Sequence, residues 1–334
     1  MSERRGAARL PASLLGRGLT YAAAAAALSL VAIALAAEVL SQDVLARAAA
    51  IPPAALAGLL GLSLLNYVAR ALRWQIYARC VGAAIGFGLT LLYYVAGFAL
   101  TLTPGKLGEA LRLWFLRQHH GLRYERTAPI LIADRVSDAV ALATIAVVAA
   151  LTQGRMLLVA APAALAIALG VMLLAQPRLA LRLISAAYGR IGRWPRFFAR
   201  LRTVLRMTAA LASPGTLLPG TAIALLGWLA EALAFYWVLL LLGAEIGPAM
   251  AAFIFALAML AGAAAMLPGG LGGTELTMVA LLDLAGVGTA TAVAATAVIR
   301  ATTLWFACGL GFVALPVAVR GPWLKHRAVG LQGG

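Results

Sequence analysis

Long apolar segments alternate with short polar connections along almost the whole chain. Several segments approach 20 residues, the length at which a helix rising about 1.5 Å per residue crosses the roughly 30 Å hydrocarbon core of a bilayer. The pattern predicts helices near residues 19–40, 54–72, 85–103, 107–118, 128–151, 156–175, 214–242, 250–267, 271–286 and 289–317. We therefore expect an all-α integral membrane protein with one polytopic domain over residues 1–334. The segment at 19–40 is longer than the apolar core of a signal peptide, so we expect a retained span.

Composition supports this class, because 63% of the residues are hydrophobic and only 11% are charged. The net charge of +16 would suggest nucleic acid in a soluble protein, but the basic residues here gather between apolar segments. That distribution indicates membrane orientation and anionic headgroups, so we expect no nucleic-acid partner. Two cysteines far apart, Cys80 and Cys308, imply neither a disulfide framework nor a thiolate metal site.

The basic residues also predict the topology. They gather in five connections: residues 4–17, 70–79, 117–126, 178–206 and 320–327. The positive-inside rule places all five in the cytoplasm, with both chain ends, in a bacterial inner membrane. This requires segments 85–118 and 250–286 to enter and leave on the same side. We expect about six full spans and two re-entrant hairpins inserted from opposite faces. The basic segment 178–206 is either a surface helix on anionic headgroups or a plain cytoplasmic loop.

Two similar motifs lie 164 residues apart, at the predicted hairpin turns: Thr103-Pro-Gly-Lys-Leu-Gly-Glu109 and Leu267-Pro-Gly-Gly-Leu-Gly-Gly-Thr-Glu275. Each interrupts an apolar run and restarts a helix that carries an early glutamate. Chance recurrence is one interpretation in a chain with 34 glycines and 14 prolines. The shared residue order instead favours an inverted repeat of the kind found in transporters, with repeat-like halves at 54–151 and 214–317.

Ionisable residues inside membrane segments are costly and indicate functional sites. Glu109 and Glu275 either cap the helices that they begin or contact a ligand beside free helix N–H groups. Arg112 lies one turn after Glu109 and can pair with it. Arg300, near the centre of the last span, needs Glu275 or Glu231 as a partner. These arginines either form fixed ion pairs or bind a headgroup phosphate.

A second charged group begins the segment at 128–151. Asp134 and Asp138 share a helical face, where like charges repel, so a cation must lie nearby. The candidates are Arg135, Arg112, a proton or an exchanging ion. The group is either a salt-bridged network that holds the hairpin or part of a proton-coupling path. Glu231, beside Trp228, is a buried acid of unassigned role.

Signals for catalysis and cofactors are weak. Gly105-Lys106 lacks the spacing of a phosphate-binding loop, and the glycines at 269–273 do not match the dinucleotide fingerprint. His119-His120 lacks neighbouring ligands for a metal. We expect no catalytic residue, no metal and no cofactor, and no enzymatic activity.

The motifs resemble the transmembrane region of lysylphosphatidylglycerol synthases, a flippase-like family. The resemblance covers Pro104-Gly-Lys106-Leu-Gly108-Glu109-Ala-Leu-Arg112, Asp134-Arg135-x-x-Asp138, Arg73-Trp74, and Pro268-Gly-Gly270-Leu-Gly272-Gly-Thr-Glu275 with the later Arg300. Asp134 stands where glutamate is commoner, and Gly273-Thr274 replace an apolar residue and an arginine. The resemblance implies a stand-alone membrane region without the synthase domain, and it leaves the lipid open.

These observations predict a lipid translocase that moves a phospholipid, glycolipid or polyprenyl-linked lipid between leaflets. The alternatives are a lipid-modifying transferase or an accessory subunit beside a lipid-synthesising enzyme, and a transporter of a small solute. We assign headgroup binding to the residues at the two breaks and to the later arginine: Lys106, Gly108, Glu109, Arg112, Gly270, Gly272, Glu275 and Arg300. A coupling or structural network comprises Asp134, Arg135, Asp138 and Glu231.

Overall fold

The computed structural model describes residues 49–103, 107–152, 177–192, 213–265 and 267–329, together with residues 46–47 and short stretches within 158–211. The predicted span at 19–40, most of the segment at 156–175 and Lys106 lie outside the described residues. Every regular element in the described part is helical, as the sequence predicts.

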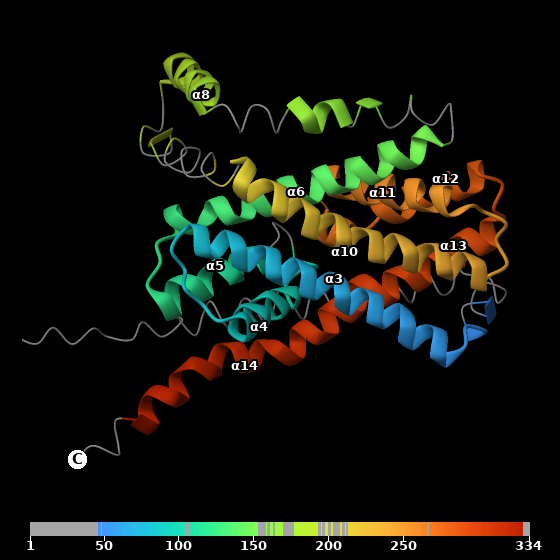
Figure 1. The fold of residues 1–334 in the computed structure, drawn as a ribbon, viewed down its shortest axis with the longest axis horizontal. Coiled ribbons are helices and arrows are strands. Elements are labelled where there is room, and N and C mark those ends of the chain that lie inside the picture. Colours follow the sequence, from blue (N-terminus) through green and yellow to red (C-terminus); the bar gives the residue numbers. More distant parts are fainter. Residues whose placement is uncertain are drawn as a thin grey trace, which may run out of the picture.

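The helices form an elongated bundle whose long members run along its length (Figure 1). In chain order they are α3 (Pro53–Cys80), α4 (Phe87–Phe98), α5 (Leu107–His120), α6 (Tyr124–Leu151), α8 (Pro177–Ile191), α10 (Pro214–Leu241), α11 (Pro248–Ala264), the short turn η2 (Pro268–Gly270), α12 (Gly273–Leu284), α13 (Thr289–Arg300), the π-turn η3 (Ala301–Trp305) and α14 (Phe306–Val329). The predicted helices between 54 and 317 are therefore present wherever the structure describes the chain.

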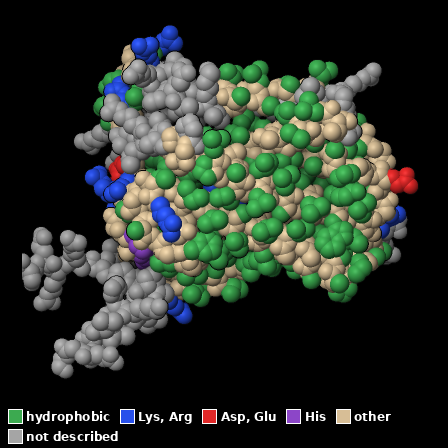
Figure 2. All heavy atoms as spheres, viewed as in Figure 1, with side chains coloured by type: hydrophobic (Ala, Val, Ile, Leu, Met, Phe, Trp, Pro, Cys, Tyr) green, Lys and Arg blue, Asp and Glu red, His purple; other side chains and the backbone are tan. Residues whose placement is uncertain are grey.

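Within the described residues, three helices are long and apolar enough to cross a bilayer: Pro53–Cys80, Gly215–Leu241 and Thr289–Arg320. Helix α6 has 28 residues, a length of about 42 Å, but it carries several ionised side chains. Large apolar side chains such as Leu226, Leu233 and Val313 are exposed on the bundle. Figure 2 shows hydrophobic side chains over most of the face between the two ends. This surface matches a lipid environment, and the chain is a multi-pass membrane protein.

Two short helix pairs lie at opposite ends of the bundle (Figure 1). The first helix pair, α4–α5, has helices of 12 and 14 residues, and the second, α11–α12, has helices of 17 and 12 residues. At about 1.5 Å per residue, each helix is shorter than the roughly 30 Å hydrocarbon core. The chain therefore reverses inside the bundle between the two helices of each pair, and the second reversal contains the motif that begins at Pro268.

Each pair closes at a glycine. A Cβ atom on Gly108 would overlap the carbonyl oxygen of Gly97, and one on Gly262 would overlap the hydroxyl of Thr274. Small residues thus let the two helices of each pair approach closely, as in many membrane helix interfaces. The second turn also needs Gly269 and Gly272 in left-handed conformations, with φ of 61° and 83°.

The tips of the two pairs meet in the middle of the bundle. Leu102 of the first turn packs with Leu304 and Cys308, and Leu271 of the second turn packs against the same cluster. A Cβ atom on Gly269 would lie 2.7 Å from Leu102 Cδ2. The two chain reversals are therefore brought together by contacts that no local pattern encodes.

The structure corrects one part of the charge pattern. The sequence places Arg70 and Arg73 in a cytoplasmic connection after a helix that ends near residue 72, but α3 continues to Cys80. The Arg73 side chain is fully buried, and that of Arg70 is 14% exposed. Only Arg79 of this group is exposed at the helix end. Helix propensity carries α3 past the apolar stretch, so these two arginines point into the bundle.

Helix α8 falls within the basic segment 178–206 and is strongly amphipathic. It lies at the end of the bundle that also holds α5 (Figure 1). Of the two interpretations of this segment, a helix and a plain loop, the structure has a helix over these residues, and its position on a lipid surface stays a prediction.

The contact between α14 and the first turn yields a stability prediction. A Cβ atom on Gly311 would overlap the backbone of Ala99, whereas Gly309 has no neighbour within 4 Å. We expect Gly311→Ala to lower the free energy of unfolding by about 1–3 kcal/mol through overpacking. Gly309→Ala, two residues away on the same helix, should be neutral or stabilising by up to about 1 kcal/mol. Denaturant unfolding in detergent micelles measures both, and equal stabilities of the two variants would contradict this packing.

Candidate functional site

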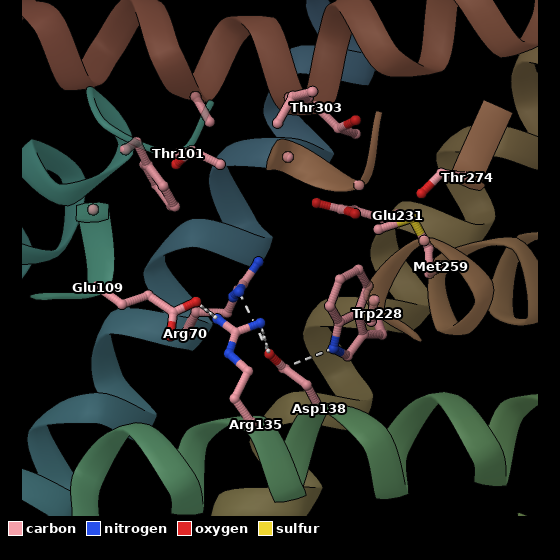
Figure 3. Close-up of a pocket in the computed structure, with 18 of the residues that line it drawn as sticks. Arg70, Thr101, Glu109, Arg135, Asp138, Trp228, Glu231, Met259, Thr274 and Thr303 are labelled. Carbon is pink, nitrogen blue, oxygen red and sulfur yellow. Dashed lines mark hydrogen bonds and ion pairs between the residues drawn. The ribbon is translucent and has the colours of Figure 1, made fainter. Parts of the chain in front are cut away.

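A cavity of about 220 Å³ lies where the two helix pairs meet. Both turns line it, with Thr101 and Gly108 from the first and Gly269 and Gly270 from the second. Helices α3, α5, α6, α10 and α13 supply its charged side chains, several of which point toward one another (Figure 3). The predicted sites at the two breaks therefore form one site.

Behind this cavity, Arg73 of α3 binds two carboxylates of α6. Its Nε and Nη2 donate to Asp134 Oδ1 at 2.9 and 2.5 Å, and its Nη1 donates to Asp138 Oδ1 at 2.7 Å. All three residues are at most 5% exposed. Charge-assisted bonds of this length are strong, and they join α3 to α6.

Asp138 is the most connected acid of the site. Besides Arg73, it accepts a hydrogen bond from Trp228 Nε1 at 2.9 Å. Arg70 and Arg135 lie 3.4 and 3.5 Å from its Oδ2. The carboxylate is therefore held by α3, α6 and α10 together, as Figure 3 shows.

The prediction of the cation beside Asp134 and Asp138 is thus only partly right. Arg135 contacts both acids, but the shortest contacts come from Arg73, which sequence reasoning placed in a connection. The spacing of Arg70 and Arg73, one helical turn apart, was a signal that both could face one neighbour. The network interpretation gains support, because these carboxylates are paired within the described residues.

Glu109 joins the first helix pair to α6. Its Oε1 lies 2.9 Å from Arg135 Nη2. The predicted pair between Glu109 and Arg112 is absent from the described ion pairs. One turn apart on α5, the two side chains diverge because Arg135 of α6 attracts the carboxylate, and Tyr94 of α4 attracts the guanidinium.

Arg112 is 3% exposed and lines the cavity. Its guanidinium carbon lies 3.6 Å from the centroid of the Tyr94 ring, a cation–π contact. A side chain at position 97 would collide with the Arg112 side chain, so Gly97 leaves the space that Arg112 occupies. Among the described residues, its Nε and Nη1 atoms have no hydrogen-bond partner. A buried guanidinium with free donors is an incomplete interaction, and an anion would complete it.

At the second break, the charged side chains pair with each other and with nearby backbone groups. Glu275 Oε2 accepts a hydrogen bond from the Gly272 N–H at 2.7 Å, which caps α12. Its Oε1 accepts another from Arg300 Nε at 2.6 Å, and Arg300 Nη2 donates to the Gly269 carbonyl at 2.7 Å. The capping interpretation of Glu275 is confirmed, and of the two predicted partners Arg300 takes Glu275. Gly270 lines the cavity.

A π-turn follows Arg300 directly, over Ala301–Trp305. Such turns leave a carbonyl group without its usual helical partner and are frequent at functional sites. The Tyr67 hydroxyl of α3 donates to the carbonyl oxygen of Thr303. The irregular backbone is therefore stabilised by the same helix that carries Arg73.

Glu231 of α10 also lines the cavity and is 4% exposed. Figure 3 shows its carboxylate pointing into the cavity, near Thr274 and Thr303. Among the described residues it takes part in no hydrogen bond or ion pair within 4.0 Å. It differs in this from the other acids that line the cavity or stand behind it.

The chain belongs to the family described as the lysylphosphatidylglycerol synthase TM region, whose model matches residues 22–311. It is 29% identical over 272 residues to a UPF0104 membrane protein of Methanothermobacter thermautotrophicus. That match covers 73% of this chain and 80% of the archaeal protein. The resemblance carried by the two Pro-Gly motifs and the Asp-Arg-x-x-Asp element is therefore confirmed at the level of the family.

The pairing of Arg73 makes a testable prediction. Arg73→Met leaves two buried carboxylates without their main cation, so we expect a loss of about 3–5 kcal/mol in stability, seen as failure to recover folded protein. Arg79→Met, on the exposed end of the same helix, should stay within about 0.5 kcal/mol of wild type. Adding Asp134→Asn and Asp138→Asn to Arg73→Met should restore part of the yield in size-exclusion chromatography. No recovery in the triple variant would contradict a charge-based role.

Proposed function

We propose that this protein is a lipid translocase that moves a lipid headgroup between the leaflets of a bacterial inner membrane, with both chain ends in the cytoplasm. The unpartnered Arg112 guanidinium in the central cavity is the observation that carries this proposal. Membership of a family named for a lipid synthase membrane region supports a lipid as the cargo. In this proposal the protein binds and moves the lipid without changing it chemically, and no cofactor takes part.

The arrangement of the helix pairs supports alternating access. Two short pairs at opposite ends of the bundle suit re-entrant hairpins inserted from opposite faces, related as an inverted repeat. Their tips meet at the cavity, so a small movement of either pair would open the site toward one leaflet. The close glycine contacts let each pair move as a rigid unit.

The cavity size suits a headgroup rather than a whole lipid. Drug-sized ligands need pockets of about 300–1,000 Å³, and this cavity measures about 220 Å³. Acyl chains would remain among the exposed apolar side chains while the phosphate reaches Arg112. Arg300, Gly270 and Gly108 then complete the wall around the headgroup. The paired acids Asp134 and Asp138 hold the bundle, and movement follows a gradient of the lipid or of an ion.

Leaflet exchange in proteoliposomes tests this proposal. We expect Arg112→Ala to lower the rate of headgroup exchange at least tenfold, because one charge-assisted contact is worth about 1.5–3 kcal/mol. Arg117→Ala is the matched control, since Arg117 lies on the same helix but is exposed, with its guanidinium over the Tyr124 ring. It should exchange lipid at the wild-type rate. Equal rates for Arg112→Ala and wild type would remove Arg112 from the site.

Mass spectrometry of copurified lipid separates translocation from the alternatives. An intact lipid is expected. A chemically modified product would favour a transferase, and a bound soluble solute without lipid would favour a small-solute transporter. An intact lipid without leaflet exchange would favour an accessory subunit that presents lipid to a synthesising enzyme.

A further inference from the structure

The charged residues that the structure describes in and behind the cavity are balanced. The cations are Arg70, Arg73, Arg112, Arg135 and Arg300, and the acids are Glu109, Asp134, Asp138, Glu231 and Glu275. Ion pairs join eight of these ten residues. Among the described residues, the two that remain are Arg112 and Glu231, which carry opposite charges.

These two side chains do not neutralise each other. No ion pair within 4.0 Å joins them, and they come from different helices, α5 and α10. Both line the same cavity and both are more than nine-tenths buried. An isolated buried charge is costly, so each needs a partner that the described protein does not supply. The cavity therefore presents separate positive and negative points to whatever enters it.

We propose that Glu231 is the cation-binding point of the headgroup site, so that the site selects phospholipids whose headgroup carries both a phosphate and an ammonium group. The phosphate would bind Arg112, and the ammonium would bind the Glu231 carboxylate. This inference rests on the proposed lipid translocation and specifies its cargo. A zwitterionic headgroup satisfies both unpaired charges and leaves the balanced network intact.

The surroundings of Glu231 are compatible with a bound ammonium. Its neighbours from α3 are Arg70, committed to Asp138, and Tyr67, whose hydroxyl donates to Thr303. From α13 comes Arg300, committed to Glu275. Helix α6 contributes Asp138, while α11 and α12 contribute the neutral Met259 and Thr274. Arg70 and Arg300 are thus already paired with other acids, and the Glu231 carboxylate can bind a ligand.

A purely anionic headgroup would leave the charge at Glu231 unbalanced. It would satisfy Arg112 but leave the Glu231 carboxylate buried without a partner, unless a proton neutralises it. Binding of such a lipid would then take up a proton and weaken as the pH rises. A zwitterionic lipid needs the ionised carboxylate of Glu231, so its binding should not weaken as the pH rises. The two ligand classes are therefore distinguishable in the wild-type protein.

Competitive lipid binding to the purified full-length protein, followed by native mass spectrometry, tests the inference. Phosphatidylethanolamine and phosphatidylglycerol with identical acyl chains are the probes. We expect wild type to prefer phosphatidylethanolamine by about tenfold, the value of one charge-assisted contact. Glu231→Gln should abolish this preference without lowering the affinity for phosphatidylglycerol. The matched control is Glu245→Gln, at an exposed position in the connection after α10, which should keep the preference.

The outcomes separate this inference from the proposed function. If wild type exchanges both lipids between leaflets but binds them equally at every pH, Glu231 has no role in selection and translocation still stands. If neither lipid is bound or exchanged, both proposals fail. Should Glu231→Gln not fold, the wild-type pH series decides. A phosphatidylglycerol affinity that falls with rising pH, beside a phosphatidylethanolamine affinity that does not fall, supports the inference, and parallel pH profiles overturn it.

Discussion

The rest of the structure depends on one guanidinium, that of Arg73, held between two carboxylates of a neighbouring helix. A buried charge is costly unless it is paired and hydrogen-bonded. Arg73 meets that condition through three bonds to Asp134 and Asp138, and in doing so fixes α3 against α6. Trp228 of α10 donates a hydrogen bond to Asp138, which joins a third helix to this pair. A helix with ionised residues can therefore stand beside the apolar helices that cross the membrane.

The two helix pairs are attached to this frame differently. The first is tied through Glu109 to Arg135 of α6, which leaves Arg112 with free donors over Tyr94. In the second, Glu275 caps its own helix and binds Arg300. Similar sequence motifs thus produce one open and one closed arrangement. The difference leaves an unpaired guanidinium in the cavity at the first pair, while the unpaired carboxylate, that of Glu231, comes from outside both motifs.

Much of the candidate site was predictable because it lies in short sequence patterns. The breaks at the two Pro-Gly motifs, the early glutamates and the need of Arg300 for an acidic partner followed from spacing and burial cost, but the choice of Glu275 over Glu231 did not. The partners of Asp134 and Asp138 did not. Arg73 lies 61 and 65 residues away from these two acids in the chain. Because it follows an apolar stretch, the sequence predicts that it lies in a connection between helices. Helix length was the deciding quantity, since α3 extends to Cys80.

The sequence by itself determined the membrane class, the helix positions, the two reversals of the chain and the family. These properties depend on local hydrophobicity, on Pro and Gly, and on the order of motif residues. Only the tertiary structure decided which charges pair and which stay unpaired. Arg112 and Glu109 are one turn apart on α5, yet aromatic and ionic neighbours on other helices separate them. Ion pairing in a bundle is set by the distance between helices, which local sequence does not encode.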